Sequence, residues 1–227
     1  MQRKILPSLL AILSSLALNL LGETELPAMF GDHMVLQRDK PVPVWGWSEE
    51  DQEVKVTFGG KSASARAGKD GRWEVRLPAM KANDQGRELT IEGSKKIIIK
   101  DVLVGEVWVC SGQSNMEWSV NGALNPNEEK QAADHPKIRH IKVPKIPSDS
   151  HERNFKAKWQ VCSPATAGGF TAVGYYFGRT LMGQLDVPIG LINSSWGGTR
   201  IEPWMPIEGY QIIKDHCKVN NVPLILM

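Results

Sequence analysis

A serine at position 114 stands where a catalytic nucleophile could be placed. The preceding segment, residues 107–110, is apolar throughout, which is typical of a parallel strand covered on both faces. Gly112 then permits a sharp turn, so Ser114 follows the carboxyl end of the expected strand. Ligands of open α/β sheets bind outside the carboxyl ends of the strands. Ser114 is therefore a candidate nucleophile, and the plainer alternative is that it caps the helix that follows.

Two glycines follow a second apolar segment much further along the chain. Residues 188–193 predict a strand, and Gly197 and Gly198 come shortly after it. A sheet of order 2-1-3 places this third parallel strand beside the first, which would bring the glycines next to Ser114. Backbone N–H groups at such positions can stabilise the oxyanion of a tetrahedral intermediate. The alternative is that both glycines only shape a turn.

Both segments resemble blocks of a known family. The strings CSGQSNMEW and NSSWGGTRIEPW are similar to two blocks of the SGNH-type serine esterases, in the sialate O-acetylesterase branch. The resemblance implies that Ser114 takes an acetyl group from a sugar hydroxyl and that water then releases it, without a cofactor. It also implies oxyanion donors in the N–H groups of Ser114 and of Gly197 or Gly198. Gln113 and Asn115, on either side of the serine, are assigned to oxyanion or substrate binding.

Two further blocks of that family have no counterpart here. One is a Gly-Glu-Ser-Asn-like segment, and the other is the late Asp-x-x-His block that supplies the base and its orienting acid. None of the five histidines has an aspartate three residues before it: His33, His135, His140, His151 and His216. A base could still come from a distant part of the sequence, because triads are defined by geometry. The expected place of three of these histidines, residues 135, 140 and 151, is the surface.

The sequence patterns around the serine predict an α/β fold with two parts. Residues 23–100 alternate with period two between turn signals, which predicts a small β-sandwich with a hairpin at residues 69–72. Residues 101–227 predict the first part of an SGNH-like, flavodoxin-like sheet. Its further elements are a strand at 137–143 and a helix at 171–185.

Only three parallel strands fit into residues 101–227, and the third is expected to be an unpaired edge. We therefore expect the chain to be the N-terminal portion of a longer esterase. The alternative from a different class is a non-catalytic glycan-binding protein, or an inactive fragment, on an esterase scaffold. A lipase or peptidase is disfavoured because the chain contains no G-x-S-x-G elbow.

The N-terminus predicts export. Arg3 and Lys4 precede an apolar stretch that ends near Gly22, which is the layout of a secretory signal peptide over residues 1–22. We therefore expect a secreted or periplasmic protein with no stable membrane span after cleavage. Of the 27 basic residues, Arg3 and Lys4 belong to this segment, which leaves 25 basic against 25 acidic residues. This balance argues against a nucleic-acid partner and leaves an O-acetylated carbohydrate as the expected partner.

The three cysteines leave two alternatives open. One pair of Cys110, Cys162 and Cys217 could form a disulfide, or all three could be buried thiols. The sequence contains no spacing typical of a metal site. With 41% apolar and 23% charged residues, the composition is that of a folded globular protein.

Overall fold

A computed structural model describes residues 22–148, 150 and 152–201, together with positions 204, 205, 208, 209, 211, 212, 215 and 218. Nearly all of the expected signal peptide lies outside the described residues. The same holds for His151, His216 and Cys217.

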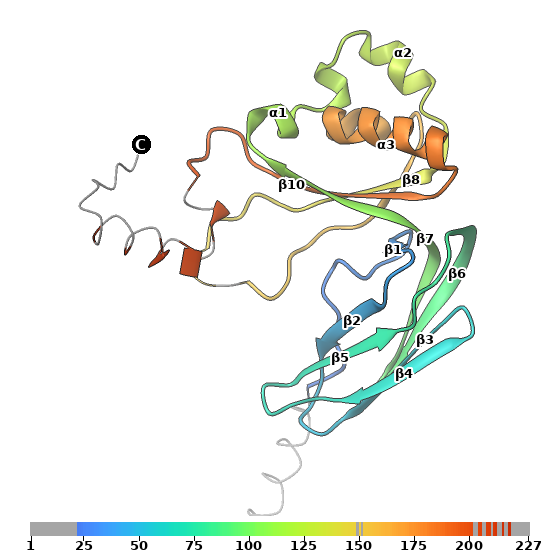
Figure 1. Ribbon diagram of the computed structural model, residues 1–227, viewed down its shortest axis with the longest axis vertical. Coiled ribbons are helices and arrows are strands. Elements are labelled where there is room, and N and C mark those ends of the chain that lie inside the picture. Colours follow the sequence, from blue (N-terminus) through green and yellow to red (C-terminus); the bar gives the residue numbers. More distant parts are fainter. Residues whose placement is uncertain are drawn as a thin grey trace, which may run out of the picture.

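Eight of the ten strands in the described part of the chain belong to one mixed sheet (Figure 1). Its order is β4-β3-β6-β7-β10-β8-β9, with β1 paired to β7, and β2 and β5 form a separate ribbon. The strands are β1 Val35–Gln37, β2 Val42–Trp47, β3 Glu53–Phe58, β4 Lys61–Arg66, β5 Arg72–Leu77, β6 Asn83–Glu92, β7 Lys96–Gly112, β8 His135–Lys142, β9 Gln160–Cys162 and β10 Ile189–Ser195. The α-helices are α1 Ser114–Glu117, α2 Pro126–Gln131 and α3 Ala172–Leu185, and 3-10 turns occur at Val120–Gly122 and Ala167–Gly169. This is a sheet-rich α/β architecture.

Strand β7 joins the two parts of the fold. Its first residues pair antiparallel with β6, its middle pairs with β1, and residues 106–112 pair parallel with β10. Asp101 within it has a φ of 53°, a left-handed conformation that Asp tolerates better than most residues. In Figure 1 the strand curves from the lower β-rich part into the upper part that carries the helices. The boundary expected near residue 100 therefore lies inside one strand.

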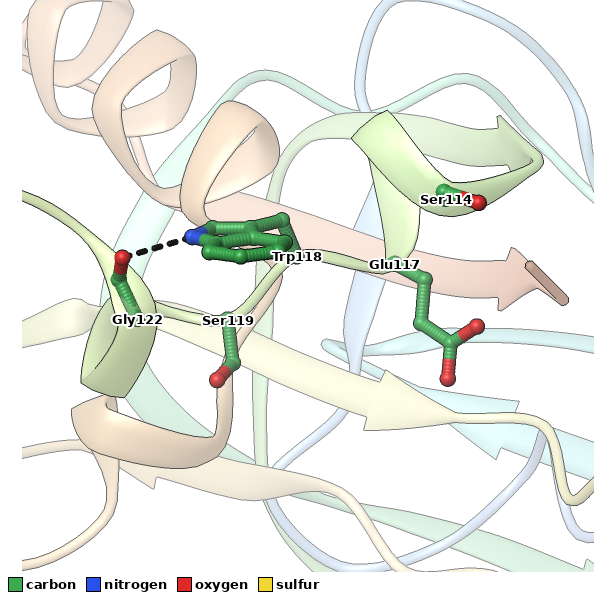
Figure 2. Close-up of a pocket in the computed structure, with 5 residues that line it drawn as sticks. All are labelled: Ser114, Glu117, Trp118, Ser119 and Gly122. Atoms are coloured by element: carbon green, nitrogen blue, oxygen red, sulfur yellow. Dashed lines mark hydrogen bonds between the residues drawn. The ribbon is translucent and has the colours of Figure 1, made fainter.

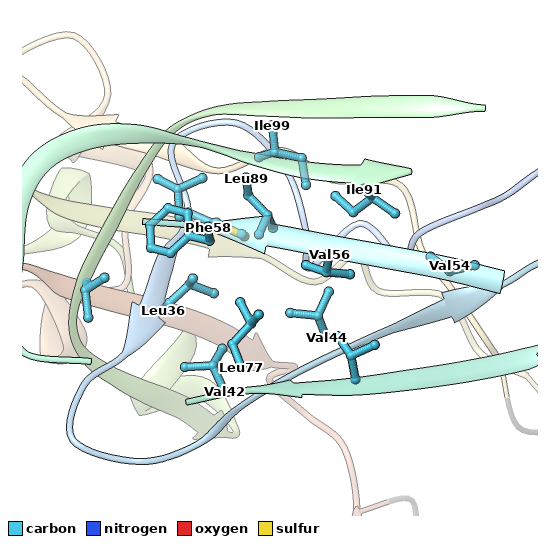
Figure 3. Close-up of a cluster of buried hydrophobic side chains, with 14 of the residues drawn as sticks. Leu36, Val42, Val44, Val54, Val56, Phe58, Leu77, Leu89, Ile91 and Ile99 are labelled. Carbon is cyan, nitrogen blue, oxygen red and sulfur yellow. The ribbon is translucent and has the colours of Figure 1, made fainter. Parts of the chain in front are cut away.

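The N-terminal part is held together by apolar side chains from both of its sheets. Figure 3 shows these buried side chains gathered between the β2–β5 ribbon and the strands β3, β6 and β7. The alternating residues of β3 and β5 supply this core, as their period of two predicts. Phe58 and Leu77 are almost fully buried.

The hairpin predicted at residues 69–72 is wrong. The turn there connects β4 to β5, but β4 pairs with β3 and β5 pairs with β2. The chain crosses from one sheet to the other at this point. Hairpins lie instead between β3 and β4, where Gly59 and Gly60 adopt positive φ angles, and between β6 and β7. Strand β4 was missed because its sequence, KSASAR, has no large apolar residue.

The predicted strand order 2-1-3 is also wrong in one respect. Strand β10 does lie beside β7, but β8 pairs with the other side of β10. The third parallel strand is therefore central and not the expected unpaired edge, and antiparallel β9 follows beyond β8. The expected helix at 171–185 is confirmed as α3, which packs over this part of the sheet (Figure 1).

The free edge belongs to β7 instead. Within the described residues, positions 106–112 have a strand partner on one side only. Trp108 and Val109 are consequently 42% and 65% exposed, so the expected cover on both faces of this segment is not found there. Trp108 contacts Phe177 of α3 edge-on, with ring centroids 5.0 Å apart.

Two of the cysteines are buried thiols. Cys110 and Cys162 form no disulfide, and burial raises the pKa of each thiol to about 11. Among the described residues, no group of histidine, cysteine and carboxylate side chains is arranged to hold a metal ion. None of the described helices has the length and apolar character needed to cross a membrane.

The contact of β7 with the start of β10 yields a stability prediction. A Cβ added at Gly105 would lie 1.9 Å from the carbonyl oxygen of Pro188, so both backbones would have to move. We expect Gly105→Ala to lower the free energy of unfolding by about 3 kcal/mol or more. Gly183→Ala in α3 is the control, since no atom lies within 4 Å of its added Cβ. It should be stabilising by about 0.5–1 kcal/mol in the same urea titration, and equal effects of both substitutions would contradict the prediction.

Candidate active site

Ser114 lies at the start of α1, directly after the end of β7. The N-cap of this helix is Gln113, whose side chain makes no capping hydrogen bond, and Ser114 is the first helical residue. The alternative that Ser114 serves as the helix cap therefore does not hold. Its side chain is exposed and lines a pocket, so the hydroxyl is accessible to a ligand.

The end of β10 brings Gly197 against this serine. Gly112 pairs with Ser195, and the N–H of Trp196 donates to the Gly112 carbonyl at 2.9 Å. A Cβ added at Gly197 would lie 2.9 Å from Ser114 Oγ and 3.3 Å from Ser114 Cα. Any side chain at position 197 would therefore crowd the hydroxyl. The predicted adjacency of the two segments follows from the β7–β10 register.

Glu117 links the two segments. Its Oε2 accepts a hydrogen bond from the Gly197 N–H at 2.5 Å, and its Oε1 is paired with the Lys145 ammonium group. Both contacts favour the ionised carboxylate, so the pKa of Glu117 lies below its usual range, with Lys145 as the larger cause. No role for Glu117 is predicted from the sequence. The sequence feature that could have indicated a role is the spacing of Glu117 from Ser114, because residues three apart on a helix lie on the same side.

The other predicted residues lie around this link. The side-chain amide of Gln113 donates to the carbonyl oxygen of Thr199, which ties the end of β7 to the loop after β10. Asn115 is exposed on α1. Gly198 has a φ of 76°, a conformation that favours glycine, and no atom lies within 4 Å of the position its Cβ would take. The structure thus gathers all five predicted site residues at one end of the parallel strands.

A pocket of about 370 Å³ opens beside the serine. Figure 2 shows the residues that line it: Ser114, Glu117, Trp118, Ser119 and Gly122. This volume lies within the range of small-molecule sites. The pocket offers the hydroxyl groups of Ser114 and Ser119, one carboxylate and one indole ring.

The described histidines lie away from Ser114. His135 is the first residue of β8, so it lies at the opposite end of the parallel strands from Ser114. His33 pairs with Asp101 at 2.7 Å, but the part of β7 between Asp101 and Gly112 corresponds to roughly 36 Å of strand at about 3.3 Å per residue. His140 is 1% exposed, in contrast to its expected place at the surface, and it stacks on Phe170. Burial lowers the pKa of His140 to about 3, so this ring stays neutral.

Comparison with known proteins identifies the family. The sequence model of the carbohydrate esterases described as sialic acid-specific acetylesterases matches residues 104–220. The chain belongs to this family. The matched range contains Ser114, Gly197 and the pocket, so the site described above lies in the part of the chain that matches the family.

Relatives and one solved structure agree with this assignment. Sialate O-acetylesterase from Homo sapiens is 34% identical over 192 residues, and the enzyme of that name from Rattus norvegicus is 32% identical over 193 residues. These alignments cover 75% and 76% of this chain but 36% of each relative. A carbohydrate acetylesterase from Xanthomonas citri superposes with a TM-score of 0.78 at 42% identity, covering 82% of this chain and 43% of that one. The chain therefore spans well under half the length of these proteins.

The link between Glu117 and Gly197 should control the exchange of one amide. A hydrogen bond to a charged group is worth about 1.5–3 kcal/mol, so Glu117→Gln should speed hydrogen exchange of the Gly197 N–H about tenfold or more. Glu129→Gln is the matched control, because the Glu129 carboxylate pairs with Arg179. Nuclear magnetic resonance of the labelled protein measures both. An unchanged rate in Glu117→Gln would contradict the link.

The same amide should report the ionisation of Glu117. The pKa of Glu117 is lowered in the folded state from its ordinary value of 4.5. The stabilisation that its carboxylate gives through the Gly197 hydrogen bond is therefore fully present above pH 4.5, and it is lost as the pH falls through the folded-state pKa. We expect the protection factor of the Gly197 amide to be constant between about pH 8 and 5 and to fall only below that range. In the Glu117→Gln variant the protection factor of the Gly197 amide should not vary with pH. A loss of protection between pH 7 and 5 in the wild-type protein would exclude the assignment.

Proposed function

We propose that this chain carries the nucleophile of a serine esterase that removes O-acetyl groups from sugars. The observation that carries the proposal is the close approach of Gly197 to Ser114 at the carboxyl ends of β7 and β10, with Ser114 lining an open pocket. The family membership supports the reaction class. The relatives from rat and human are named sialate O-acetylesterases, which supports an O-acetylated sialic acid as the substrate.

In the proposed reaction, Ser114 Oγ attacks the acetyl carbonyl while a base takes the hydroxyl proton. The sugar leaves as an alcohol after it receives that proton, and water then hydrolyses the acetyl-enzyme. Gln113 and Asn115 flank the nucleophile and are proposed to contact the oxyanion or the substrate. No metal or cofactor takes part in this scheme.

The N–H groups of Ser114 and Gly198 are the proposed oxyanion donors. The Gly197 N–H donates to the Glu117 carboxylate, so it could serve a substrate oxygen only by giving up that bond. Gly198 follows it directly and has open space where its side chain would be. Each such donor is worth about 2.7–4 kcal/mol of transition-state stabilisation.

The finer features of the chain are part of the same proposal. Residues 1–22 act as a signal peptide and direct the protein out of the cytoplasm, to a secreted or periplasmic location. Residues 23–100 form the small β-sandwich, and residues 101–227 form the SGNH-like part. The buried core shared by the β2–β5 ribbon and β3 supports the sandwich. The partner is a carbohydrate and not a nucleic acid.

A second candidate is a glycan-binding protein without catalysis on the same scaffold. It is favoured by one observation: none of the histidines within the described part of the chain lies at Ser114. His33 and His140 are placed elsewhere, as described above.

Acetate release from an O-acetylated sialic acid tests the proposal. We expect Ser114→Ala to lower kcat at least about 10³-fold, since loss of a nucleophilic serine removes the covalent route. Ser111→Ala is the control, because Ser111 is an exposed serine on β7 just before the turn. It should keep the wild-type rate. Measurable acetate release that is equal in Ser114→Ala and in the wild type would refute the role of Ser114, and saturable sugar binding without any release by either protein would favour the second candidate.

A further inference from the structure

Trp118 is a large aromatic side chain that stays 59% exposed although its position is fixed. Its Nε1–H donates to the Gly122 carbonyl oxygen at 2.7 Å. A Cβ added at Gly122 would lie 2.7 Å from Nε1 and 2.9 Å from Cε2, so part of the ring lies directly against the Gly122 backbone. The polar edge of the indole is therefore satisfied within the protein. What remains open to solvent is an apolar ring surface.

The backbone that carries Trp118 is anchored as well. The Trp118 carbonyl oxygen accepts from the Ala172 N–H at 2.7 Å, and the Val120 N–H donates to the Phe170 carbonyl oxygen at 3.1 Å. Between them, Ser119 forms an antiparallel bridge with Thr171. The segment is thus attached to the N-terminus of α3 over three consecutive residues. A ligand that contacts the indole would have little conformational entropy to remove from it.

The indole and Ser114 line the same pocket. Figure 2 shows the ring of Trp118 directed toward the Gly122 carbonyl oxygen, with the Ser114 side chain at another part of the pocket and the Glu117 side chain pointing away from the ring. An exposed, rigid aromatic ring next to a nucleophile needs an explanation, since burying such a ring would release free energy. A pyranose ring offers a matching surface, because the C–H groups on one of its faces are apolar while its hydroxyl groups point outward.

We propose that Trp118 is a stacking platform for the sugar of the substrate. The pyranose ring lies with its C–H face on the indole, and its acetyl ester reaches Ser114. This inference rests on the proposed esterase function and adds the specificity of the site. It implies selection for acetyl esters of cyclic sugars over acetyl esters of short open-chain alcohols, which cannot cover the ring.

Binding to a non-hydrolysing variant tests the platform separately from catalysis. Titration calorimetry would use Ser114→Ala as the parent and methyl 6-O-acetyl-α-D-glucopyranoside and glycerol monoacetate as ligands. We expect Ser114→Ala/Trp118→Ala to bind the acetylated sugar roughly tenfold more weakly than the parent, and Ser114→Ala/Trp118→Phe to keep most of the affinity. The phenyl variant retains a flat ring, so it separates stacking from any effect on folding.

Trp108→Ala in the same Ser114→Ala background is the matched control. Trp108 is also exposed, at 42%, but it lies on the free edge of β7 against α3. It should leave the affinity for the acetylated sugar unchanged, and glycerol monoacetate should bind equally weakly to all variants.

Two results would overturn the platform. Equal sugar binding by the parent and the Trp118→Ala variant, together with serine-dependent acetate release by the wild-type chain, would refute the platform and leave the esterase intact. Absence of sugar binding by the parent and of acetate release by the wild type would refute both proposals.

Discussion

The register of β7 against β10 is the constraint on which the rest of the site depends. It pairs Gly112 with Ser195, so the two strands end at the same level and the turns that follow them meet. Ser114 and Gly197 each lie two residues beyond that last pair. A shift by one residue would send every side chain to the opposite face and separate the hydroxyl from the glycine. The nucleophile is thus positioned by backbone pairing far more than by any side chain of its own helix.

That register is in turn fixed by packing at the other end of the same strand. β7 is also a member of the N-terminal sheet, where Ile99 and Val102 are buried in the core that it shares with β3 and β6. Gly105 lies against the Pro188 carbonyl oxygen, and the Glu106 N–H donates to that oxygen at 2.9 Å, just before β10 begins. The N-terminal part therefore contributes to the geometry of the site. It holds the strand that delivers the serine.

Several elements could be predicted from the sequence because their patterns are local. The alternation in β3 and β5, the helical spacing of α3 and the apolar run before Ser114 all predict the observed type of structure. The sheet order and the hairpin could not be predicted, since they depend on which edges pair, and KSASAR in β4 alternates only alanine with polar residues. The same limit applies to the site. Ser114 and Gly197 belong to recognisable strings, whereas the link from Glu117 to Lys145 joins segments 28 positions apart in the sequence without any pattern between them.

The pocket owes its shape to α3 as much as to the strands. The N-terminus of this helix reaches beneath the segment after the nucleophile: the Thr171 hydroxyl donates to the Met116 carbonyl oxygen at 2.6 Å, and the Ala172 N–H donates to that of Trp118. This reach requires α3 to lie close to the sheet. Gly174 permits it, since a Cβ there would be 2.8 Å from the sulfur of Cys110 in β7. Gly174 thus lets α3 pack against Cys110 of the first parallel strand. The start of α3 can then hold the segment that carries Trp118 beside Ser114.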